Sequence, residues 1–129
     1  MASPALGYVI LWVEDVERAL GFYTDTLGFT VLSDASPAFA DVQRGNLRLL
    51  LSGPKSSAGR PMADGAQPAP GGWNRIHLIV DDLEGDVARL EAAGASFRNP
   101  IVEGPGGKQI LLIDPSGNFV ELFQPAAAS

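Results

Sequence analysis

The only histidine of the chain, His77, lies in the stretch NRIHLIVDD (residues 74–82), whose alternation of apolar residues predicts a β-strand. Imidazole is a common ligand of transition metals, and it also forms hydrogen bonds with small molecules. A third interpretation is a partly buried histidine that is satisfied by a neighbouring side chain. The residues next to His77 do not decide between the three, but a comparison of the chain with itself narrows the choice.

The composition argues against several classes of protein. The chain has 129 residues, a formal net charge of −6 and a pI near 4.5, and an acidic surface repels nucleic-acid phosphates. It has no cysteine, which excludes disulfides, a thiolate zinc site and a cysteine nucleophile. Its apolar runs are too short to span a bilayer, and the opening MASPALG lacks the regions of a signal peptide. We therefore expect a soluble cytoplasmic protein.

Two segments of the chain share one pattern: YVILWVEDVERALGFYTDTLGF (residues 8–29) and RIHLIVDDLEGDVARLEAAGASF (residues 75–97). Each segment predicts an apolar strand, then an amphipathic helix, then a glycine that ends the helix. Asp15 and Asp82 correspond at an offset of 67 residues. Each is well placed to cap the N-terminus of its helix.

Short β-like runs follow each predicted helix, and the last run of each set begins with the same dipeptide. The dipeptides are Gly45-Asn46 and Gly117-Asn118, at an offset of 72 residues. We therefore predict two βαβββ modules, residues 6–52 and 75–124, within one domain over residues 1–129.

The segment between the modules, residues 53–74, is rich in Gly, Pro, Ala and Ser and has no periodicity. This composition is typical of a mobile linker. The alternative is a lid over a binding site, with Trp73 or Met62 touching the ligand.

The sequence resembles the vicinal oxygen chelate superfamily, which includes glyoxalase I, extradiol dioxygenases, fosfomycin-resistance enzymes and bleomycin-resistance proteins. The resemblance is carried by WVEDVERALGFYTDTLGF, LIVDDLEGDVARLEAAG and LIDPSGNFVELFQP, in the right order on an internal repeat. It implies an α+β fold in which two βαβββ modules form a cupped mixed sheet. Such a cup is usually completed in a homodimer, sometimes with modules exchanged between chains. The resemblance does not fix the activity, because this fold hosts many functions.

The resemblance also implies where metal-dependent members take their ligands: one position in the first and one in the last strand of each module. These positions fall at Tyr8, Leu49, Arg75 and Glu121. Only Glu121 is an ordinary ligand, because leucine has no donor atom and arginine stays protonated. His77 lies two residues, about 6.5 Å, beyond the usual position. We therefore expect no metal, no cofactor and no metal-ligand role for His77, which leaves it the roles of a satisfied histidine or of a hydrogen-bonding group for a small molecule; a rearranged His77–Glu121 metal site is the alternative.

Strand alternation separates two faces. One is aliphatic, as expected beneath helices, and comprises Val9, Leu11, Val13, Ile76, Leu78, Val80, Val120 and Leu122. The other mixes large apolar and aromatic side chains with a few polar ones: Tyr8, Ile10, Trp12, Leu47, Leu49, Leu51, Arg75, His77, Ile79, Phe119, Glu121 and Phe123. Such a wall suits a small-molecule pocket, but the core of a dimer interface has a similar composition. Both interpretations stay open.

The polar residues of the second face suggest one specific pair. Arg75 and Glu121 are expected to face each other across the cup, because a buried charge without a partner would be costly. Phe39 and Asp41 are candidates for the same wall, although the pattern leaves the parity of their strand unsettled.

We predict metal-independent binding and sequestration of a small, largely apolar aromatic molecule, as in bleomycin-resistance-like proteins, with antibiotic resistance as the purpose. The predicted ligand-binding residues are Tyr8, Trp12, Phe39, Leu49, Arg75, His77, Phe119 and Glu121. The main alternative is a glyoxalase-type lyase, isomerase or dioxygenase that uses Glu121 or a rearranged His77–Glu121 site. A third is a structural or regulatory dimer without a ligand. The expected partners are the small molecule and a second copy of the chain, not nucleic acid or a membrane.

Overall fold

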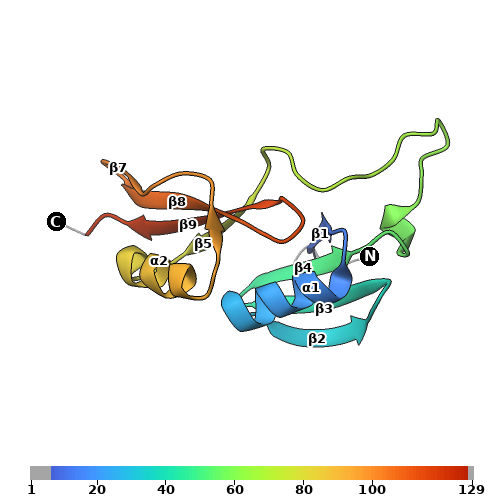
Figure 1. Cartoon of the computed structure of the whole chain (residues 1–129), viewed down its shortest axis with the longest axis horizontal. Helices are drawn as coiled ribbons and strands as arrows, with labels where there is room; N and C mark the ends of the chain where they lie inside the picture. The colour runs from blue at the N-terminus through green and yellow to red at the C-terminus, as the bar shows by residue number, and fades with distance from the viewer. Residues whose placement is uncertain (1–6, 128–129) are drawn as a thin grey trace. The chain divides into compact units, whose positions relative to one another are not determined.

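The structure is a computed structural model that describes residues 7–127. The first residue of the predicted N-terminal module, residue 6, lies outside this range, as does most of the MASPALG stretch. The chain divides into two compact units, with the boundary between Pro70 and Gly71. Each unit has its own sheet and its own helix (Figure 1).

The first unit contains a four-stranded sheet in the order β1-β4-β3-β2. Its strands are β1 (Val9–Trp12), β2 (Thr30–Ala35), β3 (Phe39–Arg44) and β4 (Leu47–Ser52). β1 runs parallel to β4, and the other neighbours are antiparallel. The helix α1 (Val16–Gly21) continues into a π-helical segment, η1 (Phe22–Thr26), and packs on β3 and β4 (Figure 1).

The second unit contains a five-stranded sheet in the order β5-β9-β8-β6, with β7 also paired to β8. Its strands are β5 (Ile76–Ile79), β6 (Ser96–Phe97), β7 (Val102–Gly104), β8 (Gly107–Ile113) and β9 (Phe119–Pro125). The helix α2 (Leu83–Ala92) packs against β9. Both units thus follow the order βαβββ, with the short β7 added in the second, and the predicted α+β class is confirmed.

Both helices begin where the sequence predicts. Asp15 and Asp82 are the N-cap residues, and each carboxylate accepts a backbone N–H of the first helical turn at 3.1 Å. Such a bond satisfies one of the amides that the helix leaves without a partner. Gly28 and Gly94 follow the helical segments with φ of 75° and 85°, the left-handed conformation of a helix C-cap.

Each unit buries the sheet face that its helix covers. In the first unit this face and the helix contribute Val13, Val16, Ala19, Tyr23, Ala40, Val42, Leu49 and Leu51 to the core. In the second unit they contribute Ile76, Leu78, Leu83, Leu90, Ile110, Leu112, Val120 and Leu122. The predicted aliphatic face is therefore confirmed, although Val9, at the start of the outer strand β1, remains exposed.

The prediction for β4 was wrong by one residue. Leu47, Leu49 and Leu51 were assigned to the face of Ile10, but Leu49 is the direct partner of Val9 and is fully buried on the helix side. The cause is the turn that precedes each last strand. Two residues, 45–46, separate β3 from β4, whereas the five-residue turn 114–118 separates β8 from β9. Judged by pairing with the parallel partner strand, the counterpart of Glu121 is Leu50, at an offset of 71 residues, and not Leu49 at the offset of 72 that separates the two Gly-Asn dipeptides.

The ends of the segment between the predicted modules are attached to the units. Near its start, the 3-10 helix η2 (Ser57–Gly59) packs against β1 and β4. Gly59 is buried there so tightly that a Cβ would lie 2.3 Å from the carbonyl oxygen of Gly53. Near its end, the Trp73 ring packs at a tilt against the ring of Phe119 in β9. Among residues 7–127, no helix is long and apolar enough to cross a membrane.

Candidate functional site

The sheet face opposite the helix in each unit is here called the open face. In the first unit it carries Tyr8, Ile10, Trp12, Phe39, Asp41, Gln43, Arg48, Leu50 and Ser52, as the strand register requires. In the second unit it carries Arg75, His77, Ile79, Val102, Gln109, Leu111, Ile113, Phe119, Glu121 and Phe123. The open faces carry half of the large apolar side chains that are exposed among the described residues: Tyr8, Ile10, Phe39, Ile79 and Val102.

On the second open face, three side chains from residues 73–77, just before β5 and at its start, meet three from β9, each pair 46 positions apart in the sequence. The Trp73 and Phe119 rings have centroids 5.3 Å apart, and the His77 and Phe123 rings have centroids 5.2 Å apart. Between these aromatic pairs, Arg75 binds Glu121 through Nε at 2.9 Å and Nη2 at 2.8 Å. We call this arrangement the three-pair ladder.

Glu121 is the buried centre of the ladder, with only 5% of its surface exposed. Arg75 donates to its Oε1, and His77 Nδ1 lies 3.1 Å from its Oε2. Both carboxylate oxygens thus have a partner, which is what a charge removed from water requires. The predicted pairing of Arg75 with Glu121 is confirmed, but it joins neighbouring strands of one sheet and not two sides of a cup.

Trp73 is held at the edge of this face by the backbone. The N–H of Gly71 donates to Asn118 Oδ1 at 2.7 Å, and Asn118 is itself bound to Asp114 through its backbone N–H and its Nδ2. Arg75 Nη1 also donates to the carbonyl oxygen of Trp73 at 3.3 Å. These contacts position the indole on the second unit while leaving 68% of the residue exposed.

The first open face has an ion pair of its own, which the sequence analysis missed. Arg48 Nε donates to Asp41 Oδ1 at 2.9 Å, and Nη2 donates to Oδ2, so the pair is bidentate. The guanidinium lies over the Tyr8 ring, 4.4 Å from its centroid. These bonds from Arg48 hold the pKa of Asp41 below its usual value, and they raise the pKa of Arg48.

The predicted site residues divide into two groups. Tyr8, Trp12 and Phe39 share the first open face, and Arg75, His77, Phe119 and Glu121 share the second. The exception is Leu49, which is in the core and cannot touch a ligand on either open face. Arg48 stands between Leu47 and Leu49 in NLRLLLS. A lone arginine in an apolar strand was the signal that could have identified it.

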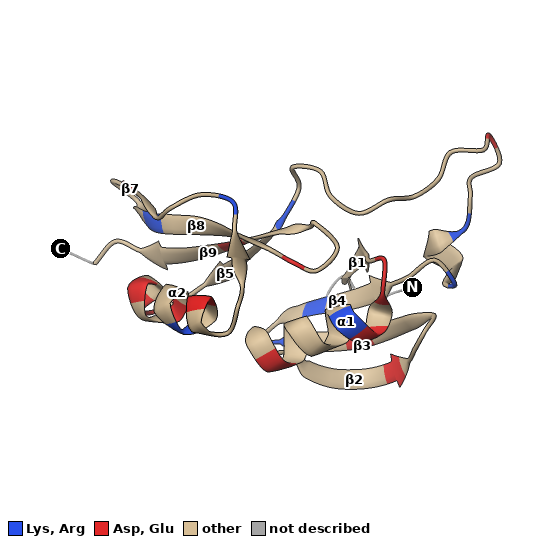
Figure 2. Ribbon diagram, viewed as in Figure 1, with Lys and Arg blue, Asp and Glu red and all other residues tan. Residues whose placement is uncertain are grey.

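Charged surface on the helix sides of the units lies apart from the open faces. α2 carries a cluster of acidic residues (Figure 2), and one of them, Glu84, accepts from Lys108 Nζ at 3.0 Å. This bond raises the pKa of Lys108. The acidic groups are mostly solvated, as expected of a helix surface.

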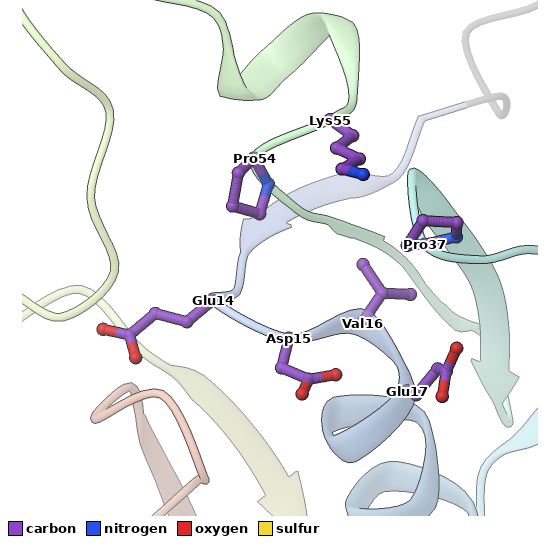
Figure 3. A pocket seen from close by; sticks show the side chains of 7 residues that line it. All are labelled: Glu14, Asp15, Val16, Glu17, Pro37, Pro54 and Lys55. Carbon is purple, nitrogen blue, oxygen red and sulfur yellow. The ribbon is translucent and has the colours of Figure 1, made fainter.

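A hollow of about 320 Å³ lies beside the start of α1 (Figure 3). Its walls come from the β1–α1 connection, the β2–β3 turn and the segment after β4: Glu14, Asp15, Val16, Glu17, Pro37, Pro54 and Lys55. Asp15 is already engaged as the helix cap, and the lining includes none of the predicted ligand-binding residues. We do not assign it a ligand.

A family model described as Glyoxalase/Bleomycin resistance protein/Dioxygenase superfamily matches residues 5–122. The chain belongs to this superfamily. A curated relative, lactoylglutathione lyase of Schizosaccharomyces pombe, is 23% identical over 144 residues, which cover 95% of this chain and 48% of the relative. The chain therefore spans about half the length of that relative.

Two solved structures of the superfamily fold are similar over nearly the whole chain. A superfamily member from Sphaerobacter thermophilus is 29% identical with a TM-score of 0.73, over 92% of this chain and 98% of that one. TnmS3, an antibiotic binding protein from Streptomyces sp. CB03234, is 28% identical with a TM-score of 0.67, over 96% and 100%. These similarities support the fold and leave the specific function open.

The metal-ligand positions implied by the superfamily do not suit a metal ion in this chain. The position in the first unit that is equivalent to Glu121 is Leu50 and not Leu49. Leu50 pairs with Ile10 in the same way that Glu121 pairs with His77. Leucine still supplies no donor atom, and a second position, Arg75, is a cation bound to Glu121. Among residues 7–127, no group of three or more His, Asp or Glu side chains could hold a metal ion.

Proposed function

We propose that the chain binds a small, planar, largely apolar molecule on its open faces without a metal ion. The three-pair ladder is the observation that carries this proposal. It presents aromatic surface on both sides of an ion pair that is already compensated. A flat aromatic guest can cover the rings without leaving a charge unpaired.

The energetics favour a ligand of this kind. Trp73 is held by hydrogen bonds around it, yet most of its surface remains in water. An offset or edge-to-face aromatic contact contributes about 0.5–1.5 kcal/mol beyond the burial of apolar area. Because the indole is already positioned, little conformational freedom is lost when a guest stacks on it.

Binding without turnover can by itself serve a biological purpose. Binding alone lowers the free concentration of a drug, so a stoichiometric binder can protect a cell without turnover. The similarity to an antibiotic binding protein supports this interpretation. We therefore propose sequestration of an aromatic antibiotic on the second open face, and Tyr8, Trp12 and Phe39 give the first open face an aromatic surface of its own.

Fluorescence offers a direct test, because the chain has only two tryptophans, Trp12 and Trp73. In a Trp12→Phe background, daunorubicin and other planar polycyclic antibiotics should quench Trp73 and raise the melting temperature. Phe119→Ala should weaken binding because the indole loses its support. Met62→Ala, a change at another exposed apolar residue, serves as the control. The proposal fails if no compound in the panel changes either signal.

One observation favours a second candidate, an enzyme of the lyase or isomerase type. The His77 and Glu121 contact resembles a base oriented by a carboxylate. Glu121 itself is a poor base here, because both of its oxygens already accept from donors. In that case His77 would move the proton. Mass spectrometry of the bound compound after long incubation with the protein separates the two, since turnover changes its mass and sequestration does not.

We also propose that the protein assembles as a homodimer. The outer strand β1 exposes Val9 and Ile10, and Tyr8 just before it is 50% exposed. An apolar outer strand tends to be covered by another chain. Light scattering at micromolar concentration should give twice the chain mass, and a monomer mass would remove this part of the proposal.

A further inference from the structure

The contact between His77 and Glu121 determines where the imidazole carries its proton. A carboxylate only accepts hydrogen bonds, so the nitrogen that faces Glu121 must donate. That nitrogen is Nδ1, 3.1 Å from Oε2. In neutral His77 the single N–H is therefore on Nδ1, and Nε2 carries a lone pair.

Nε2 lies on the side of the ring away from Glu121, and 47% of the side chain is exposed. The ring is also packed against Phe123 on the second open face. Its neighbours in the ladder offer mainly donors and apolar surface: Arg75 has only N–H groups, and the Trp73 and Phe119 rings are apolar. His77 Nε2 is thus the acceptor within the ladder, and Gln109, opposite Phe123, is a neighbouring polar side chain outside it.

We propose that His77 Nε2 selects planar aromatic ligands that carry a hydrogen-bond donor, such as a phenolic O–H or a ring N–H. The inference rests on the proposed function and adds a substrate class to it. A ligand whose hydroxyl is methylated keeps its aromatic surface but loses the bond to Nε2. The face should therefore distinguish a phenol from its methyl ether.

The same geometry predicts that Glu121→Gln reverses the tautomer. Arg75 can only donate, so the glutamine carbonyl oxygen must face Arg75. The amide NH₂ group then faces His77, and Nδ1 must accept instead of donate. The proton moves to Nε2, which turns the acceptor of the face into a donor.

The tautomer can be measured without any ligand, because the chain has a single histidine. In ¹⁵N-labelled protein at neutral pH, Nδ1 should show a pyrrole-type shift and Nε2 a pyridine-type shift. Glu121→Gln should exchange the two, whereas Glu84→Gln, the same chemical change on α2, should leave them as they are. A wild-type spectrum with the proton on Nε2 overturns the inference.

The ligand test uses 2-naphthol and 2-methoxynaphthalene, titrated into the wild-type protein by NMR. One hydrogen bond is worth about 0.5–1.5 kcal/mol, so 2-naphthol should bind about two- to tenfold more tightly. His77→Phe keeps a ring beside Phe123 but has no acceptor, and it should bind both probes equally. It also tests the inference if Glu121→Gln does not fold.

The outcomes distinguish the inference from the function it rests on. Equal binding of the two probes by the wild-type protein overturns the inference and leaves aromatic binding intact. A preference for 2-naphthol that persists in His77→Phe also overturns it, because another acceptor would then be responsible. Binding of neither probe, together with no response to the antibiotic panel, removes the proposed function and the inference with it.

Discussion

The two units repeat one backbone but place their arginines on opposite strands. The pairs Ile10–Leu50 and His77–Glu121 are equivalent in the two units. The residues two positions before each member of these pairs are therefore equivalent as well. In the first unit these positions hold Tyr8 on the first strand and Arg48 on the last. In the second they hold Arg75 on the first strand and Phe119 on the last. An aromatic residue and an arginine occur in both units, with their places exchanged.

The carboxylates explain how both arrangements are stable. Arg48 takes its partner from β3, where Asp41 is buried, and Arg75 takes its partner from β9, where Glu121 is buried. An arginine on an apolar face needs a carboxylate nearby, but the carboxylate can come from either neighbouring strand. The repeat therefore fixes the backbone and the core, while the chemistry of each open face is free to differ.

The largest predicted effect is a difference in stability between truncations on the two faces of β4. Leu49→Ala should reduce the free energy of unfolding by about 2–5 kcal/mol, because it leaves a cavity in the core of the first unit. Leu50→Ala, its neighbour on the open face, should cost only about 1 kcal/mol because that side chain is half-buried. Urea denaturation of both variants measures the difference, and equal losses would contradict the register described above.

The second prediction compares the two ion pairs. Arg48→Met should lower the melting temperature by a few degrees, because the buried Asp41 loses a bidentate partner while the apolar stem is kept. Arg75→Met should cost less, since Glu121 keeps its contact with His77. Arg60→Met, at an exposed residue before the boundary of the units, is the control. Calorimetry that ranks Arg75→Met as the more damaging change would reverse this comparison.

The third prediction concerns acid. The hydrogen bonds from Arg48 hold the pKa of Asp41 below its usual value, so between the folded and unfolded pKa values the unfolded chain binds the extra proton. The pair therefore stabilises the fold above that range and loses its effect as the pH falls through it. Asp41→Asn should be less stable than the wild type at neutral pH, and the gap should close from about pH 5 downward. A gap that is constant from neutral pH to pH 2 would argue against it.

Much of the fold was predictable because it follows from local and repeated patterns. Asp15 and Asp82 mark the helix starts, and strand alternation marks the buried face. The repeat did not determine the strand register, because turns of different length precede β4 and β9. Leu49 was misplaced for this reason.

The candidate site was predictable only where the partner could be inferred from the repeat. Arg75 and Glu121 occupy corresponding metal-ligand positions, so their pairing was expected. Arg48 and Asp41 pair across a hairpin whose register the sequence does not show. The contact between Trp73 and Phe119 depends on the path of the backbone through residues 71–74. This stretch begins with two glycines and has no periodic pattern from which its backbone path could be predicted.

The smallest predicted effect is that of metal ions. It compares the two units at the positions where metal-dependent members of the superfamily are expected to take their ligands. In the first unit Tyr8 lies against the Arg48 guanidinium, and Leu50 has no donor atom. In the second unit Arg75 occupies one carboxylate oxygen of Glu121 and repels a cation. Zinc, nickel, iron or manganese should therefore neither copurify in stoichiometric amounts nor raise the melting temperature, and chelators should leave ligand binding unchanged. About one equivalent of metal by elemental analysis, lost on chelation together with an activity, would instead favour an enzyme with a rearranged site at His77 and Glu121.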